Sequence, residues 1–361
     1  MSERTVLITG ATGLLGREVA TTFGLKNWNV KGTGYSRADG VNTFKINLSD
    51  ETEVGEFLDE TKFAIPPLYR CCASRLTLLS TSRPQVIVHC AAQRFPDKVD
   101  KDPESARELN VAASKALAKL AADRDIFVIY ISTDYVFPGT PGDAPYEADA
   151  KPQPTNLYGQ TKLDGERAVL DTLKQIGKEG LGVVLRVPVL YGNAETPAES
   201  AVNVLMDALW KAQTQGAEIS MDHWAIRYPT NTEDIGRVCH VLPKLLEGKQ
   251  VREDIPLTLS TDISVKYLDA PTKERSCLPR VLQFSSEDRM TKYEIVTLFG
   301  EIMGLSTEGI KPNTEGNDPN ASVQRPYDCH LSTKALKDMG IDVSTCDFKG
   351  WWRREVRAFR K

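Results

Sequence analysis

The 361-residue sequence contains few cysteines and histidines and no long apolar run. Its seven cysteines include no C-x-x-C pair and its four histidines show no metal-ligand spacing, so we expect neither a disulfide framework nor a metal site. No stretch approaches the ~20 apolar residues that a membrane helix needs. A strand pattern begins within the first residues, so we expect no signal peptide. The cysteine pattern, which offers no disulfide framework, favours a reducing compartment, and we expect a cytoplasmic protein. The formal net charge of −4 argues against broad nucleic-acid binding.

Three glycines follow the first apolar run at the spacing G-x-x-G-x-x-G. Residues 5–9 are rich in β-branched side chains and predict a strand, and a helix pattern runs from residue 14 to about residue 25. Gly10 can take the backbone angles of a tight turn, Gly13 leaves room for phosphates, and Gly16 lets helix and strand pack closely. The unpaired N–H groups at the helix start attract anions. These features predict a site for a dinucleotide pyrophosphate.

The end of the second predicted strand bears on the choice of dinucleotide. That strand, residues 28–34, leads into Tyr35, Ser36 and Arg37 without an acidic residue at its end. An acid there would hold the ribose hydroxyls of NAD, whereas Arg37 is suited to the 2′-phosphate of NADP. Asp39 leaves NAD open as an alternative, and Arg37 open as a simple surface charge. From this pattern we expect NADP(H).

The following segments alternate between strand and helix patterns. A short strand at residues 44–48 would bring Asn47 and Leu48 to the adenine side of the site. The small residues Cys90, Ala91 and Ala92 would permit close approach of a cofactor at the end of the next strand. Further strands are predicted at 84–92, 127–133 and 182–186, and helices at 50–60, 103–122 and 157–173. This β-α-β order predicts an α/β fold with a doubly wound parallel sheet of the Rossmann type.

Changes in composition set the expected domain boundaries. Residues 61–82 fit no regular element of a βαβ unit and are interpreted as an insertion. Strand signals weaken after residue 186, which predicts a Rossmann domain over residues 1–186 and a smaller α/β substrate or partner domain over residues 187–361. In the second domain we expect residues 228–246 to fold back on the first domain and residues 247–279 to form another insertion.

Tyr158 and Lys162 are spaced i, i+4 at the start of a predicted helix and therefore share one face. A lysine ammonium beside a tyrosine hydroxyl would lower the pKa of the tyrosine, which could then pass a proton to a carbonyl oxygen as hydride arrives. Lys162 could also hold the nicotinamide ribose. Ser132 or Thr133, at the carboxyl end of a strand, could bind the same carbonyl. The alternative is an exposed helical pair without chemistry.

Together these features resemble the extended short-chain dehydrogenase/reductase superfamily. The resemblance rests on Thr9-Gly10-x-x-Gly13-x-x-Gly16, His89-Cys90-Ala91-Ala92, Asn110 and Tyr158-x-x-x-Lys162. Residues 132–137 (STDYVF) and 156–166 (NLYGQTKLDGE) are similar to the dTDP-4-dehydrorhamnose reductase family. The chain resembles one eukaryotic branch of that family, the regulatory (beta) subunits of methionine adenosyltransferase, more closely still. The blocks that carry this are 86–92, 185–192, 199–202, 221–224, 227–230, 290–294 and 324–326.

The resemblance implies a set of site residues. The implied NADP(H) contacts are Thr12, Gly13, Leu14, Leu15, Tyr35, Ser36, Arg37, Asn47, Leu48, Cys90, Arg94, Tyr158 and Leu185. Gly10, Gly16, Ala91 and Lys162 join them from the patterns described above. The expected catalytic residues are Thr133, Tyr158 and Lys162.

The resemblance leaves the function between two main alternatives. In the regulatory branch the Rossmann protein binds the catalytic subunit of methionine adenosyltransferase, tunes S-adenosylmethionine synthesis, and is not known for a reaction of its own. The other alternative is an NADPH-dependent reductase of a nucleotide-linked 4-keto sugar, with Tyr158 as the proton donor. Rhamnose reductases usually carry a tryptophan in the strand that follows the catalytic helix, near the sugar. In this chain Arg186 is followed by residues 187–190 (VPVL) without a tryptophan, which favours the regulator.

Two further points stay open in the sequence. The basic tail at residues 349–361 is either a segment that docks on a partner or a last amphipathic helix against the core. A third function, a partner that senses the NADP(H) redox ratio, would require the two redox forms to bind with different affinities.

Overall fold

The computed structural model describes residues 4–35, 37–59, 83–215, 218–240, 263–270 and 277–357. Ser36, the expected insertion at 61–82 and much of the expected insertion at 247–279 lie outside these residues, as do residues 358–361 of the tail. Within the described part of the chain, no helix combines the length and apolar composition needed to cross a bilayer.

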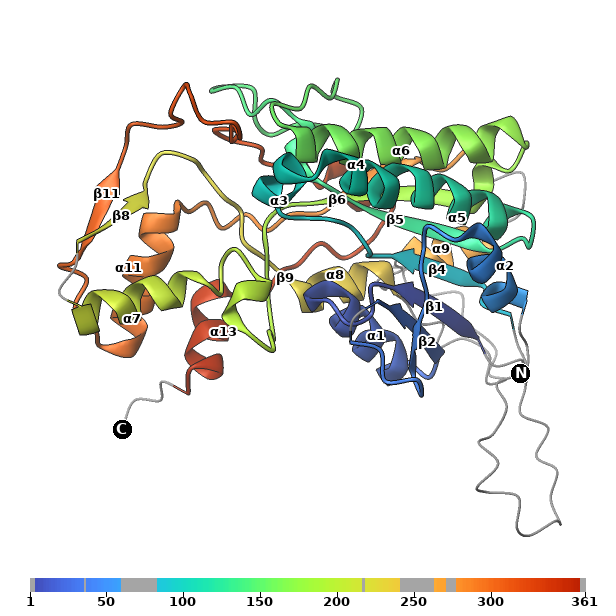
Figure 1. Cartoon of the computed structure of the whole chain (residues 1–361), viewed down its shortest axis with the longest axis horizontal. Helices are drawn as coiled ribbons and strands as arrows, with labels where there is room; N and C mark the ends of the chain where they lie inside the picture. The colour runs from blue at the N-terminus through green and yellow to red at the C-terminus, as the bar shows by residue number, and fades with distance from the viewer. Residues whose placement is uncertain are drawn as a thin grey trace, which may run out of the picture.

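A parallel sheet of seven strands forms the centre of the larger part of the molecule (Figure 1). Its strands, in spatial order, are β10 (Val281–Gln283), β6 (Gly182–Val187), β5 (Phe127–Thr133), β4 (Val86–His89), β1 (Thr5–Thr9), β2 (Asn29–Gly34) and β3 (Thr43–Lys45). The order reverses between β1 and β4, whose register pairs Ile8 with Val88. A crevice opens at such a switch point, at the carboxyl ends of the strands.

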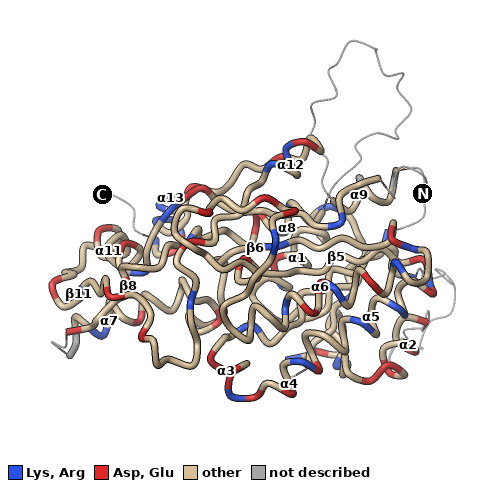
Figure 2. Tube along the Cα trace, turned by 90° about the horizontal axis from the view of Figure 1, so that it is seen from above, with Lys and Arg blue, Asp and Glu red and all other residues tan. Residues whose placement is uncertain are grey.

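Helices cover both faces of this sheet, which confirms the predicted doubly wound architecture (Figure 1). One face carries α1 (Leu14–Leu25), α8 (Thr232–Cys239), α9 (Ile263–Asp269) and α12 (Lys334–Asp338). The other carries α2 (Glu51–Asp59), α5 (Ala113–Ala122) and α6 (Leu157–Gln175). Because successive strand residues point to opposite faces, Val6 and Ile8 join the core beside α1, while Leu7 joins the core beside α2 and α5. The two outer helices α2 and α5 differ in charge: the charged residues of α2 are all acidic, and those of α5 are both lysines (Figure 2).

The predicted helix at 103–122 is built from three consecutive pieces. They are α4 (Pro103–Arg107), a π-helical segment η2 (Glu108–Ala112) and α5, preceded by the short helix α3 (Pro96–Lys101). The π-helical segment contains Asn110, a residue of the family motif. Such segments inside helices occur frequently at functional sites, because they re-aim a side chain.

A second, smaller lobe lies at the carboxyl end of the sheet (Figure 1). It contains α7 (Leu205–Gln215), α11 (Lys292–Met303), α13 (Phe348–Glu355) and a parallel strand pair, β8 (Ile219–Asp222) with β11 (Ile310–Asn313). Two short strands, β7 (Leu190–Tyr191) and β9 (Thr230–Asn231), lie between this second lobe and the sheet. The indoles of Trp351 and Trp352 in α13 are buried against Leu209 and Phe299. Of the two interpretations of the tail, the core helix is confirmed for residues 348–355.

Several segments differ from the sequence-based expectations. The third strand ends at Lys45, so Asn47 and Leu48 follow it instead of belonging to it. The described part of the expected second insertion contains α9, where Tyr267 stacks on Phe127 of the sheet at a ring distance of 4.9 Å. The boundary placed at residue 186 also leaves β10 and α12 outside the sheet lobe, to which both contribute. These long-range contacts have no local signal in the sequence.

Candidate functional site

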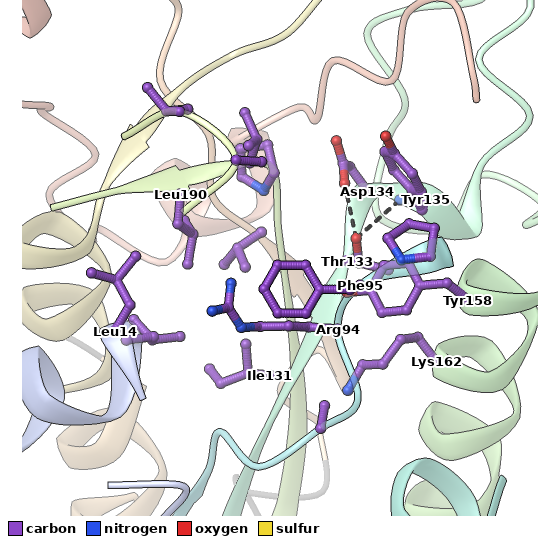
Figure 3. Close-up of a pocket in the computed structure, with 18 of the residues that line it drawn as sticks. Leu14, Arg94, Phe95, Ile131, Thr133, Asp134, Tyr135, Tyr158, Lys162 and Leu190 are labelled. Atoms are coloured by element: carbon purple, nitrogen blue, oxygen red, sulfur yellow. Dashed lines mark hydrogen bonds between the residues drawn. The ribbon is translucent and has the colours of Figure 1, made fainter. Parts of the chain in front are cut away.

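A cleft of about 320 Å³ lies between the carboxyl ends of the central strands and the second lobe. One wall of the cleft carries Thr133, Tyr158 and Lys162 (Figure 3). The opposite wall carries Leu14 and Leu190, and Arg94 extends between the two walls. The cleft therefore lies where open α/β sheets bind their ligands.

The glycine loop has the geometry that its spacing predicts. Gly10 takes φ +66°, and a Cβ at this position would lie 2.9 Å from the backbone N and Cα of Ala91. A Cβ on Gly16 would lie 2.2 Å from the carbonyl oxygen of Gly10. Gly13 is the N-cap of α1 and gives the helix start no side-chain hydrogen bond, and the first turn of α1 contains no acidic residue. The loop backbone is thus packed too closely for a Cβ at position 10 or 16, and the helix start leaves N–H groups available to an anion.

The three expected catalytic residues come together in the cleft. Thr133 donates from Oγ1 to Asp134 Oδ1 at 2.9 Å and accepts from the N–H of Tyr135 at 3.2 Å. The side chain of Tyr158 lies next to Thr133 in the cleft (Figure 3). Burial raises the pKa of Asp134 to about 6, against the opposing effect of the Thr133 hydrogen bond. The side chains of residues 133, 134 and 158 therefore form one polar group at the cleft wall (Figure 3).

The electrostatics of this group differ from the sequence-based expectation. Lys162 was expected to lower the pKa of Tyr158, but burial raises that pKa, and the neighbouring Thr133 hydroxyl opposes the rise only in part. Lys162 is itself buried, with Nζ 4.1 Å from the ring centre of Tyr130, and burial lowers its pKa to about 7. The expectation failed because helical spacing places the two side chains on one face but does not fix how much water surrounds them.

The helix that carries Tyr158 and Lys162 is fixed to the sheet by a buried ion pair. Arg186 of β6 donates from Nε to Glu166 Oε1 at 2.9 Å and from Nη2 to Oε2 at 2.7 Å. Ser132 of β5 donates to the same carboxylate at 2.5 Å. Of the two strand-end hydroxyls considered from the sequence, that of Ser132 is therefore directed to Glu166, and Thr133 is the one that lines the cleft beside Tyr158.

A second buried network holds the loop that follows β4. The imidazole of His89 lies between Thr9 Oγ1, at 2.6 Å, and Ser114 Oγ, at 3.0 Å. Asn110 accepts from the N–H of Gln93 and donates to the Gln93 carbonyl oxygen, which fixes that loop to the π-helical segment. Burial raises the pKa of the Cys90 thiol beside this loop to about 12, so the thiol stays protonated at neutral pH.

Arg37 is not a free surface charge. Its Nη1 donates to Glu195 Oε2 at 2.5 Å and to Glu199 Oε1 at 2.6 Å, and its Nη2 donates to the carbonyl oxygen of Thr12 at 2.6 Å. Both glutamates follow β7 and lead into the second lobe. Arg37 thus links the end of β2, the glycine loop and the second lobe.

The expected site residues fall into two groups. The residues that line the cleft are Gly10, Gly13, Leu14, Leu15, Gly16, Cys90, Arg94, Thr133, Tyr158 and Lys162. Those absent from its lining are Thr12, Tyr35, Arg37, Asn47, Leu48, Ala91 and Leu185, and Ser36 is outside the described residues. Leu48 and Leu185 have side chains buried in the cores, whereas Tyr35 is 69% exposed beside the glycine loop. The roles of both groups in binding stay predictions.

Sequence reasoning missed the basic side chains of the far half of the cleft. Arg227, Lys292 and Arg325 line it, and Arg227 Nη2 is buried 3.9 Å from Asp222 without a hydrogen-bond partner among the described residues. Burial lowers the pKa of Lys292 to about 8. All three lie in blocks that carry the family resemblance, at 227–230, 290–294 and 324–326. Their place in these blocks was the signal that could have found them.

Comparisons with known proteins agree with this architecture. The family model of the RmlD substrate binding domain matches residues 4–255. Methionine adenosyltransferase 2 subunit beta of Xenopus laevis is 39% identical over 95% of this chain and 84% of its own length.

Two solved structures of dTDP-4-dehydrorhamnose reductases share the fold. That of Clostridium acetobutylicum has a TM-score of 0.68 at 21% identity and covers 98% of both chains. That of Bacillus anthracis, in complex with NADP, has a TM-score of 0.68 at 18% identity and covers 99% of this chain and 100% of its own.

Proposed function

The chain belongs to the RmlD substrate binding domain family and, within it, to the methionine adenosyltransferase 2 subunit beta proteins, and on that premise we propose that it is an NADP(H)-binding regulatory subunit of methionine adenosyltransferase. The observation that carries the proposal is the 39% identity over 95% of the chain, which extends through both lobes. The proposed partner is the catalytic subunit, and the proposed effect is on S-adenosylmethionine synthesis.

The cofactor part of the proposal is supported by the shape of the glycine loop. A Cβ at Gly10 or Gly16 would meet backbone atoms within 3 Å, so the loop backbone is held as closely as a pyrophosphate site requires. Arg37 at the end of β2, with no acid in that strand, supports NADP(H) over NAD(H). Lys162 and Tyr158 would hold the nicotinamide ribose, and Arg94 would extend along the phosphates.

The experiment is a binding titration of the purified chain with the catalytic subunit of methionine adenosyltransferase. We expect a stable complex by calorimetry and size exclusion, together with a changed apparent affinity of the enzyme for methionine. The Clostridium acetobutylicum dTDP-4-dehydrorhamnose reductase, which shares the fold at 21% identity, is the matched control and should not bind. Absence of a complex at concentrations of tens of micromolar, with unchanged enzyme kinetics, would reject the proposal.

A second candidate, an NADPH-dependent reductase of a 4-keto sugar nucleotide, is favoured by one observation. Thr133, Tyr158 and Lys162 lie together in the cleft with the polar contacts that proton transfer to a carbonyl needs. A bound nicotinamide would supply hydride, Tyr158 would donate the proton, and Thr133 would orient the carbonyl oxygen. The wall beside them, Val187 to Leu190, is aliphatic where the rhamnose reductases usually have a tryptophan, so we rank this candidate second.

NADPH consumption with dTDP-4-dehydrorhamnose tests this second candidate directly. Turnover that Tyr158→Phe abolishes, with NADPH affinity within about twofold of wild type, would establish it. No turnover at high enzyme concentration would remove it and leave the regulatory proposal unaffected.

A further inference from the structure

Four charged side chains from three separate segments meet beside the glycine loop. Arg17 of α1 and Arg37 after β2 both donate to the Glu199 carboxylate, at 2.6 Å each. Glu195 accepts from Arg37 at 2.5 Å and lies 3.7 Å from Arg17. We call these residues the Arg–Glu cluster. Both arginines also donate to the carbonyl oxygen of Thr12, so the cluster joins the glycine loop to the second lobe.

The cluster already uses most of the hydrogen-bonding capacity of Arg37. A guanidinium has five N–H groups. Those on Nη1 point to Glu195 and Glu199, and one on Nη2 points to Thr12. A phosphate bound by Arg37 would therefore compete with two carboxylates for the same donors, and its charge would repel both of them.

From this arrangement we infer that Glu195 and Glu199 compete with the adenosine 2′-phosphate for Arg37, so that NADP(H), but not NAD(H), releases the 193–199 segment of the second lobe from the glycine loop. The inference rests on the proposed cofactor site and adds to it a determinant of dinucleotide specificity and a route by which the bound nucleotide reaches the second lobe.

The two glutamates differ in how firmly they are held. Glu195 has 55% of its side chain exposed and can turn into water when a phosphate arrives. Glu199 has 10% exposed, and it accepts from Arg17 and from the N–H of Glu195 as well as from Arg37. Burial opposes ionisation of Glu199, but the two arginines outweigh it and lower its pKa to about 2, so its negative charge persists at neutral pH. Glu199 is therefore the main competitor of the phosphate.

The segment that carries both carboxylates continues into the core of the second lobe. Ser200 donates to the carbonyl oxygen of Leu190 at 2.7 Å, and Val202, two residues further, is buried in the cluster that contains Leu209, Trp351 and Trp352. Glu199 is thus only three residues before Val202, so a change in its position would act on the core that holds α7 and α13. NAD(H) lacks the 2′-phosphate and has no group that competes for Arg37, so it would leave the cluster intact.

Dissociation constants of NADP⁺ and NAD⁺, measured by calorimetry on the full chain, test the specificity part. We expect Glu199→Gln to bind NADP⁺ about tenfold more tightly than wild type, because one repelling charge is gone, with NAD⁺ changed less than about twofold. Glu195→Gln, the exposed matched control, should gain about threefold or less for NADP⁺. Arg37→Met should bring the two affinities to within about threefold of each other.

Hydrogen exchange of residues 193–204 tests the release of the segment. NADP⁺ should accelerate exchange there in wild type and NAD⁺ should not, while Glu199→Gln should exchange fast without any nucleotide. Unchanged or weaker NADP⁺ binding by Glu199→Gln would overturn the inference, because Glu199 would then hold Arg37 ready for the phosphate. If wild type binds neither nucleotide, the proposed cofactor site itself fails, which is a different outcome.

Discussion

Two ion-pair systems lie at opposite sides of the cleft and differ most in their contact with water. The first joins Arg186 to Glu166, and each of these side chains is 4% exposed. The second is the Arg37–Glu195 pair of the Arg–Glu cluster, in which Arg37 is 46% and Glu195 is 55% exposed. Both systems use short, charge-assisted hydrogen bonds, so geometry alone does not distinguish them.

The difference in exposure indicates different tasks. A buried pair that loses one partner leaves an uncompensated charge in a medium that cannot solvate it, so the pair behaves as a fixed joint between α6 and the sheet. An exposed pair exchanges its partners for water, salt or another anion at small cost. The fixed joint lies beside the expected catalytic residues, and the exchangeable one lies where a charged end of a ligand is expected.

Removal of Glu166 from the buried pair should cause the largest loss of stability of the changes considered. Glu166→Met leaves Arg186 buried without its counter-charge and should lower the free energy of unfolding by roughly 3–5 kcal/mol. Urea denaturation checks this, and the exposed Glu56→Gln on α2 is the control, expected within about 0.5 kcal/mol of wild type. The double variant Glu166→Met/Arg186→Met should lose less than the single one. Equal losses in the two would show that the charge of Arg186 is not the cause.

Substitution of Gly10 sharpens the comparison at the glycine loop, which the Arg–Glu cluster contacts through the carbonyl oxygen of Thr12. Gly10→Ala places a Cβ 2.9 Å from the Ala91 backbone at a φ of +66° and should cost roughly 1–3 kcal/mol of stability, as well as most of the nucleotide affinity. Gly24→Ala in α1 is the matched control, since its Cβ meets nothing within 4 Å, and it should be neutral or stabilising by up to about 1 kcal/mol. A comparable loss in both variants would contradict this account of the turn.

The pH dependence of the free energy of unfolding tests a buried group near the cleft, the imidazole of His89. Burial, assisted by the nearby charge of Lys162, lowers the pKa of His89 to about 3, against ~6.5 in an unfolded chain. The unfolded state therefore binds a proton first as the pH falls, so stability present above about pH 6.5 is lost towards pH 3, by up to ~1.4 kcal/mol per pH unit.

Replacement of the histidine isolates this contribution. His89→Gln should flatten the dependence of the urea midpoint on pH between about 6.5 and 5 relative to wild type. His240→Gln is a second, independent test away from the cleft, because burial lowers the pKa of His240 to about 3 as well. The dependence of its urea midpoint on pH should flatten by a similar amount. An unchanged slope in His89→Gln would mean that this imidazole titrates normally in the folded protein.

The smallest effect is expected at the exposed system. Glu195→Gln should change the free energy of unfolding by less than about 1 kcal/mol, because both partners are largely solvated. That change should vanish at about 1 M NaCl, where the Debye length is ~3 Å, whereas the loss in Glu166→Met should persist there. A salt-independent loss in Glu195→Gln would remove the contrast between the two systems.

Much of the fold could be predicted because its signals are local. The β-branched run at residues 5–9, the glycine spacing and the strand patterns at 127–133 and 182–186 each describe one element and its neighbours in the chain. Parallel strands buried on both faces give continuous apolar runs, and the β-α-β order restricts the topology. The spacing of Tyr158 and Lys162 likewise placed both in the cleft, since a helix fixes which residues share a face.

The remaining features depend on residues far apart in the chain. The contacts of Arg37 with Glu195 and Glu199 span more than 150 positions, and nothing in the local sequence pairs them. The same applies to α9, which the local pattern indicates as part of an insertion, whereas its Tyr267 stacks on Phe127 of the sheet. The raised pKa of Tyr158 follows from the walls around it, which several distant segments supply.

The sequence by itself determined that this chain forms a doubly wound sheet with a glycine turn, and which helix face presents a tyrosine and a lysine, because backbone conformation and side-chain periodicity are local properties. Tertiary structure alone decided how much water reaches each charged group. Burial made Arg186–Glu166 a fixed pair and left Arg37 among exchangeable partners, because the strength of a charge interaction is set by the surroundings that folding assembles.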